Sequence, residues 1–339
     1  MNIVMIMSKD RLDQEHAMLN RIVVGLANDG HQIIRIVPFT PNENTSPYEK
    51  AVSLAKRIST PMPVSWLLRK TRREDIAQRL ERIDVDVILA FGKEAKQVAL
   101  DISPHIDAPV LKEVITMHEA KRVRKSSAIW RWLAATPTIE RTIARRVGEQ
   151  RTAFVPIAAA TSHISNSSHT TSNRCVSILD AAANPKATRL ILETVKSFQD
   201  IHLFLELTGR HQHTIWKFVQ QLEMLDRVTC LRDMASLRSL IVETDLLILP
   251  SSTMPVRTIF LEAMLASIPI VATHIEGFDM LIDEETALIT NGSWNESIKQ
   301  TLEDAHFANR IGKAGRRLIE EQYASSAQIA AFDASFTLT

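Results

Sequence analysis

Residues 249–273 read LPSSTMPVRTIFLEAMLASIPIVAT, and this stretch decides the fold class of the chain. A buried strand over 245–249 is followed by small hydroxyl residues, and a helix is predicted to begin near Arg257. That helix carries one carboxylate, Glu262, on an otherwise apolar surface. A second apolar strand follows over 268–272. In a doubly wound α/β sheet an anionic ligand binds where strands end and helices begin, so we expect a ligand site in this stretch.

Strands and helices alternate along the rest of the chain as well. Apolar runs of strand length are separated by helical patterns of about 10–15 residues, which indicates βαβ units and parallel sheets. The predicted strands cover residues 3–7, 31–38, 86–91, 110–117, 133–136 and 153–157 in the first half, and 175–179, 202–207, 228–231, 245–249 and 268–272 in the second.

The chain is predicted to form two domains, as its length of 339 residues suggests. A polar stretch without periodicity over 161–173 is typical of an interdomain linker. It separates an N-terminal Rossmann-like domain, residues 1–160, from a C-terminal one, residues 174–322. We expect a final helix in residues 323–339, long enough to return to the first domain.

The composition is that of a soluble globular protein, with 45% hydrophobic and 23% charged residues. Both cysteines, Cys175 and Cys230, lie in apolar runs, which favours reduced buried thiols and a cytoplasmic location. The short apolar run at the N-terminus is interpreted as a strand and not as a signal peptide. No run of about 20 apolar residues, as a membrane-spanning helix needs, is present.

The charge is unevenly distributed, although the net charge is only +1. Residues 1–165 contain 25 basic and 18 acidic residues, whereas residues 166–339 contain 15 and 21. A basic half next to an acidic half suggests that the first domain meets an anionic surface or substrate.

Two basic stretches of the first half contain tryptophan, and their composition suits an anionic membrane face or an anionic acceptor. The residues that would make this contact are Trp66, Arg69 and Arg72 in the first stretch and Lys121, Arg124 and Trp130 in the second. The alternative is that both stretches are solvated helix faces with their tryptophans in the core. Nucleic acid is not expected as a partner, because no recognition motif accompanies the charge.

The opening stretch resembles the donor-binding segment of GT-B glycosyltransferases of the family-4 type, which read P-S-x-x-E-x-F-G-x-x-x-L-E-A-M-A-x-G-x-P-V-V-A. Met254 stands at the first glutamate of that pattern, Arg257 at its glycine and Glu262 at its second glutamate. Further similar segments are Leu207–Arg210, Leu225–Leu231, Thr273–Gly277 and Thr116–Glu119. The resemblance implies a GT-B fold, in which two Rossmann-like domains face each other across a cleft.

The resemblance also implies a site for the donor diphosphate in the second domain. Lys186 matches a lysine that binds the diphosphate, but the position of the accompanying arginine holds Ala181 or Asp180. We hypothesise that Arg257, with Thr258 beside it at the helix start, replaces that arginine as a clamp. The alternatives are that Lys186 is merely solvated, and that Arg257 points to solvent or is salt-bridged.

Two further positions acquire expected roles from the resemblance. Glu262 would accept hydrogen bonds from the ribose hydroxyls, unless it is paired with a neighbouring base. His118 would approach the donor sugar and position it as the catalytic-site histidine, unless it is purely structural. Met254 replaces a glutamate that would bind the sugar, and losing one charge-assisted hydrogen bond costs about 1.5–3 kcal/mol.

The function expected from these residues is that of a divergent retaining glycosyltransferase of the hexosyltransferase type. It would transfer a sugar from a nucleotide-diphosphate donor to a cell-envelope or polysaccharide acceptor, glycan or lipid-linked, without a metal or further cofactor. It would act in the cytoplasm or at the inner membrane face. The rival is an inactive glycosyltransferase-like partner subunit or binding module, favoured by the missing charges and by only 9 glycines. Another GT-B activity, such as sugar-nucleotide epimerisation, is the third alternative.

Overall fold

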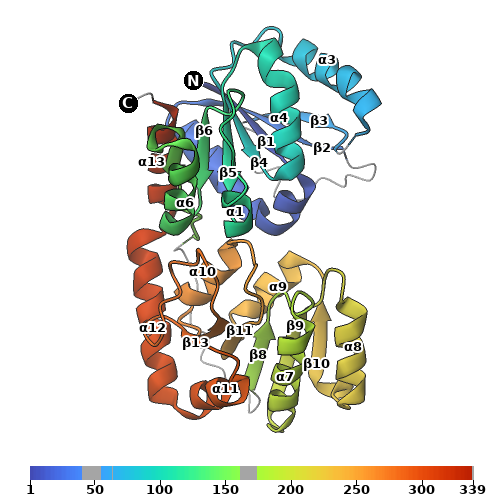
Figure 1. Ribbon diagram of the computed structural model, residues 1–339, viewed down its shortest axis with the longest axis vertical. Helices are drawn as coiled ribbons and strands as arrows, with labels where there is room; N and C mark the ends of the chain where they lie inside the picture. The colour runs from blue at the N-terminus through green and yellow to red at the C-terminus, as the bar shows by residue number, and fades with distance from the viewer. Residues whose placement is uncertain (40–54, 63, 161–173, 338–339) are drawn as a thin grey trace. The chain divides into compact units, whose positions relative to one another are not determined.

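The computed structural model describes residues 1–39, 55–62, 64–160 and 174–337, so the predicted linker over 161–173 lies outside the described residues. The chain divides into two compact units (Figure 1). Unit 1 consists of Met1–Ala158 together with the residues from Ser325 onward, and unit 2 consists of Ala159–Ala324. Each unit contains one parallel sheet covered by helices on both faces, which confirms the predicted class of two Rossmann-like domains.

The sheet of unit 1 has seven parallel strands in the order β3-β2-β1-β4-β5-β6-β7. Its central strands are apolar along their whole length, as expected of a parallel sheet that is buried on both faces. The strands are β1 (Asn2–Met7), β2 (Gln32–Pro38), β3 (Lys56–Thr60), β4 (Val87–Phe91), β5 (Val110–Val114), β6 (Arg131–Ala134) and β7 (Thr152–Phe154).

The helices of unit 1 cover both faces of this sheet. Helices α1 and α13 pack together on one face, where the rings of Phe91 and Phe332 lie 6.1 Å apart, and α3 packs with α4 on the other. Gln328 of α13 donates a hydrogen bond to the carbonyl of Pro156, which fixes the last helix to unit 1. The helices are α1 (Lys9–Asn28), α3 (Arg69–Leu80), α4 (Lys93–Ile106), α5 (Met117–Ala120), α6 (Pro137–Val147) and α13 (Ser325–Phe336), with 3-10 turns η1 (Trp66–Leu68) and η2 (Glu149–Arg151).

The sheet of unit 2 has six parallel strands in the order β10-β9-β8-β11-β12-β13. Its apolar side chains form a core with helices α7, α8 and α11 on one face. The strands are β8 (Arg174–Ile178), β9 (Ile201–Glu206), β10 (Val228–Leu231), β11 (Leu246–Leu249), β12 (Ile270–Thr273) and β13 (Leu288–Thr290).

Helices α9 and α10 pack together, and α12 packs along α10. Gly312 of α12 allows this close approach, because a Cβ atom there would lie 2.1 Å from the carbonyl oxygen of Ser267. The helices of unit 2 are α7 (Pro185–Lys196), α8 (Gln212–Gln221), α9 (Met234–Ile241), α10 (Thr258–Leu265), α11 (Trp294–Glu303) and α12 (Ala305–Gln322), with the 3-10 turn η3 (Leu225–Arg227).

The largest differences from the sequence prediction concern three strands, β3, β5 and β13. The strands predicted over 133–136, 153–157 and 268–272 are found with shifted bounds, as β6, β7 and β12. Strands β3 and β13 were not predicted, because one is short and rich in polar residues and the other has only three residues. The strand predicted over 110–117 was too long. It ends at Val114, and Thr116 instead caps the short helix α5 by accepting a hydrogen bond from the backbone N–H of Glu119 at 3.0 Å.

Candidate functional site

In unit 2, the carboxyl ends of β8 and β11 mark the point where the strand order reverses. Consecutive strands run outward from β8 in one direction and from β11 in the other. Such a switch point is where open α/β sheets bind their ligands. The loops that follow the two strands are held together by Asn184, whose side-chain amide donates a hydrogen bond to the carbonyl of Pro250 at 3.0 Å.

Lys186 lies in the first turn of α7, directly after the loop that follows β8. Asn184 caps this helix by accepting a hydrogen bond from the backbone N–H of Ala187 at 3.3 Å. The side chain of Lys186 is exposed. This position suits both interpretations of the lysine, as a ligand contact at the switch point and as a solvated helix residue.

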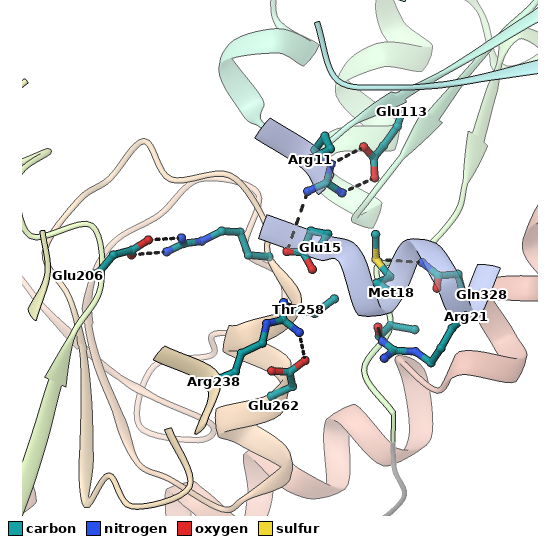
Figure 2. A network of polar contacts seen from close by, with 12 residues as sticks. Arg11, Glu15, Met18, Arg21, Glu113, Glu206, Arg238, Thr258, Glu262 and Gln328 are labelled. Atoms are coloured by element: carbon teal, nitrogen blue, oxygen red, sulfur yellow. Dashed lines mark hydrogen bonds and ion pairs between the residues drawn. The ribbon is translucent and has the colours of Figure 1, made fainter. Parts of the chain in front are cut away.

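Arg257, the residue preceding α10, forms a buried ion pair with Glu206 at the end of β9. Its Nη1 and Nη2 atoms donate hydrogen bonds to Oε1 and Oε2 of Glu206 at 2.6 and 2.8 Å. The two side chains are only 4% and 9% exposed. The guanidinium proposed as a diphosphate clamp is therefore salt-bridged within the protein, which is one of the alternatives that the sequence left open. Figure 2 shows the paired Glu206 carboxylate.

Asp180, in the loop after β8, completes this group of charges. Its backbone N–H donates a hydrogen bond to Oε2 of Glu206 at 2.8 Å. Burial and the neighbouring charge of Glu206 raise the pKa of the Asp180 carboxyl to about 6. Burial would raise the pKa of Glu206 as well, but hydrogen bonding and the charge of Arg257 outweigh it and lower that pKa.

Glu262 of α10 is paired with Arg238 of α9, a residue that sequence analysis did not identify. The Nη1 atom of Arg238 donates to Oε1 of Glu262 and its Nη2 atom donates to Oγ1 of Thr258, both at 2.6 Å (Figure 2). Arg238 and Glu262 are 20% and 17% exposed, so this pair remains accessible at the surface of the unit. Thr258 is fully buried and holds Arg238 from the inside.

Met254, at the position of the sugar-binding glutamate in the resemblance, is turned into the core and is 2% exposed. Its neighbour Val256 is buried as well. The loop after β11 is thus anchored by apolar side chains at positions 254 and 256. The substitution therefore removes a polar group from the site and adds packing to the loop.

In unit 1, the strand order reverses between β1 and β4, and the loops after these strands are closely packed. Gly92 has a φ angle of +98°, and a Cβ atom there would lie 1.9 Å from Oγ of Ser8. Beside them, Arg11 donates hydrogen bonds from Nε and Nη2 to the carboxylate of Glu113 at 3.0 and 2.6 Å (Figure 2). Glu15, at a kink in α1, lies 4.0 Å from Nη1 of Arg11.

His118 lies in α5, after the end of β5, and its side chain is exposed. The early end of β5 places it in a short helix and not in direct continuation of the strand. An exposed imidazole at this edge of the sheet can reach a ligand, and its role stays a prediction.

The two basic stretches of unit 1 differ in what they expose. In the first, the 3-10 turn η1 exposes 76% of Trp66, 66% of Leu67 and 56% of Leu68, and the exposed Arg69 follows. Arg72 does not belong to this surface, because it is buried and paired with Asp101 at 2.6 Å.

The second basic stretch presents charge without a comparable apolar surface. Lys121 and Arg124 are exposed, whereas Trp130 is half-buried with the guanidinium of Arg131 over its ring at 4.8 Å. Trp132 is buried in the core. Only the first stretch therefore combines exposed aromatic and aliphatic side chains with cations.

The residues that the structure describes lack two general features. No helix in that part of the chain is both long and apolar enough to cross a lipid bilayer. Nor do three or more His, Cys, Asp or Glu side chains gather there as a metal site would require.

One known family has a sequence model that matches most of the second unit. Residues 174–305 match the model of the family described as "Glycosyl transferases group 1". No curated protein matches the chain in sequence.

Solved structures similar to the chain cover both units. Sucrose-phosphate synthase from Thermosynechococcus elongatus is 16% identical, with a TM-score of 0.78 over 98% of this chain and 97% of that one. Anabaena Alr3699/HepE in complex with UDP-glucose is 13% identical, with a TM-score of 0.79 over 98% and 99%. A mutant of S. aureus TarM in complex with Fondaparinux, alpha-GlcNAc-glycerol and UDP is 12% identical, with a TM-score of 0.78 over 99% of both chains.

The chain therefore has the fold of the GT-B glycosyltransferases, and its second unit carries the group 1 glycosyltransferase sequence pattern. This confirms the resemblance at the level of the fold. The family-4 retaining assignment and the degenerate glutamate motif of Met254 and Glu262 stay predictions.

Proposed function

We propose that the protein is a retaining glycosyltransferase of the hexosyltransferase type, which transfers a sugar from a nucleotide-diphosphate donor. The observation that carries this proposal is the group 1 glycosyltransferase pattern over residues 174–305, which includes the switch point between β8 and β11. Similar folds hold UDP-glucose in Alr3699/HepE and UDP in TarM. No metal or cofactor besides the donor is part of the proposal.

The proposed reaction breaks the bond between the anomeric carbon and the diphosphate and forms a bond from that carbon to an acceptor hydroxyl oxygen. The hydroxyl proton passes to the departing diphosphate or to water, and negative charge develops on the diphosphate as its bond to carbon breaks. Cations aimed at this charge lower the barrier. Lys186 is an exposed cation at the switch point and is proposed to bind the diphosphate. Glu262, held by Arg238, would accept hydrogen bonds from the ribose, and His118 would position the donor sugar.

Direct titration tests this proposal. Calorimetry with uridine and guanosine diphosphate sugars should detect binding of at least one of them, and absence of binding to all would refute the donor site. Lys186→Ala should weaken binding about tenfold, as expected for one charge-assisted hydrogen bond. Lys196→Ala is the matched control, because Lys196 is an exposed lysine at the other end of the same helix and should not affect binding.

The acceptor is proposed to be a glycan or lipid-linked molecule of the cell envelope, bound by the basic unit 1 at the cytoplasmic face of the membrane. Trp66, Leu67 and Leu68 support this partner, because exposed apolar side chains next to Arg69 suit an anionic lipid surface.

Cosedimentation with phosphatidylglycerol vesicles tests the membrane contact. Replacing Trp66, Leu67 and Leu68 by serine should reduce the bound fraction at least about fivefold. The control replaces Leu190 and Leu225 of unit 2, which are exposed apolar residues as well, and should bind like the wild type. Equal loss in both variants would contradict a specific membrane surface.

A second candidate is a glycosyltransferase-like subunit that binds a partner without catalysis. The observations that favour it are the engagement of Arg257 by Glu206 and the buried Met254. Single-turnover assays with the donor that binds best distinguish the two candidates. Sugar transfer or donor hydrolysis supports the enzyme, and binding without turnover supports the subunit.

A further inference from the structure

Glu206 binds within unit 2 as an anionic ligand would. Its carboxylate accepts two hydrogen bonds from the guanidinium of Arg257 and one from the backbone N–H of Asp180. An arginine and a backbone amide at the carboxyl end of a strand are also the donors that phosphate groups use. The carboxylate of Glu206 thus occupies hydrogen-bond donors, the Arg257 guanidinium and the Asp180 N–H, that could also bind a phosphate.

The local charge differs accordingly from that of a phosphate site. Arg257 alone would make the position positive, but Glu206 and Asp180 together contribute two carboxylates. Asp180 has its backbone in the left-handed region, at a φ angle of +52°, and lies in the loop that leads to α7. A diphosphate near Arg257 therefore meets the two carboxylates of Glu206 and Asp180 beside that guanidinium.

Competition follows from the burial of this ion pair. A buried guanidinium needs an anionic partner, because removing it from water without compensation is costly. Arg257 can satisfy this need with Glu206 or with a phosphate, but the two oxygens of Glu206 already occupy both of its terminal nitrogens. Neutralising or displacing the Glu206 carboxylate removes its competition for the two terminal nitrogens of Arg257.

We propose that Glu206 is a resident carboxylate that competes with the donor diphosphate for Arg257 and the Asp180 amide. The inference rests on the proposed function of the same site. It assigns diphosphate binding in the resting protein to Lys186, and it makes Arg257 a clamp only when Glu206 is displaced or neutralised.

Removing the charge of Glu206 tests the competition. Titration of uridine diphosphate and of inorganic pyrophosphate into Glu206→Gln should show affinities about tenfold to a hundredfold higher than in the wild type. Adding Arg257→Ala to this variant should abolish the gain. Glu113→Gln is the matched control, since it neutralises the equally buried partner of Arg11 in unit 1 and should leave both affinities unchanged.

Asp180→Asn provides a second variant that keeps the Glu206–Arg257 pair intact. It removes one of the two negative charges and should raise both affinities by a few-fold. Unchanged affinities in folded Glu206→Gln and in Asp180→Asn would overturn the proposal, even where the wild type binds a nucleotide sugar. Binding by Glu206→Gln but not by the wild type would support the competition and would count against the proposed donor function. If none of the three proteins binds a diphosphate, both proposals fall.

Discussion

Each unit of the protein contains a buried arginine–glutamate pair near the carboxyl end of its sheet, and the two pairs have different surroundings. Arg11 and Glu113 lie in unit 1 beside the fully buried Glu15. Burial would lower the pKa of Arg11, but the charges of both glutamates outweigh it and raise that pKa. Arg257 and Glu206 lie in unit 2 beside Asp180, whose own pKa is raised to about 6.

In the proposal made above, the pair of unit 2 takes part in ligand binding, whereas no such role is proposed for the pair of unit 1. In unit 1 the acids around Arg11 both favour its charge. In unit 2 the carboxylate of Glu206 is stabilised by Arg257, and its pKa is lowered. The carboxylate of Asp180 lies close to that of Glu206, and burial together with this neighbouring charge raises its pKa. Arg257 can therefore replace Glu206 by another anion more easily, because loss of the Glu206 carboxylate removes its repulsion with Asp180.

Breaking the pair of unit 1 should have the largest effect on stability. Glu113→Ala removes the carboxylate that accepts two hydrogen bonds from the buried guanidinium of Arg11, and the carboxylate of Glu15 lies 4.0 Å from its Nη1 atom. We expect a loss of about 3–5 kcal/mol in the free energy of unfolding, measured by urea denaturation. Replacing Arg11 and Glu113 together by methionine should cost much less, and an equal cost would show that packing dominates.

Breaking the pair of unit 2 should cost less, because the loss of Glu206 also removes the repulsion of Asp180. For Glu206→Ala we expect a loss of about 1–3 kcal/mol, in the same urea experiment. If Glu206→Ala lowers the free energy of unfolding as much as Glu113→Ala does, the two pairs contribute equally to stability and the comparison fails.

The third effect has the opposite sign. The pKa of Asp180 is raised from 3.8 to about 6, so between these values the folded state binds more protons than the unfolded state and stability falls as the pH rises. Asp180→Asn should therefore stabilise the protein by about 2 kcal/mol at pH 7.5, and the gain should vanish below about pH 4. A gain that is independent of pH would assign the effect to something other than this carboxyl.

The fold could be predicted from the sequence because apolar strand runs alternate with helical patterns, as the two parallel sheets require. The start of α10 near Arg257 and the bounds of β10 follow from periodicity and are found as predicted. The position of Glu262 at the carboxyl end of the sheet followed from the same pattern.

The partners within the site could not be predicted from the sequence. Arg257 and Glu206 are 51 positions apart, Arg238 and Glu262 are 24 apart, and no local pattern joins them. The inward turn of Met254 depends on packing of the loop against the core, which periodicity does not describe. Pairing and orientation of this kind depend on tertiary contacts.

The last helix has a consequence for how the chain folds during its synthesis. Residues 325–336 belong to unit 1, yet the ribosome adds them only after the whole of unit 2. Until then, Phe91 and the α1 face that receives α13 lack part of their apolar cover. Unit 2 has all its residues earlier, so it can complete its core first, whereas a nascent unit 1 presents an apolar surface of the kind that chaperones recognise.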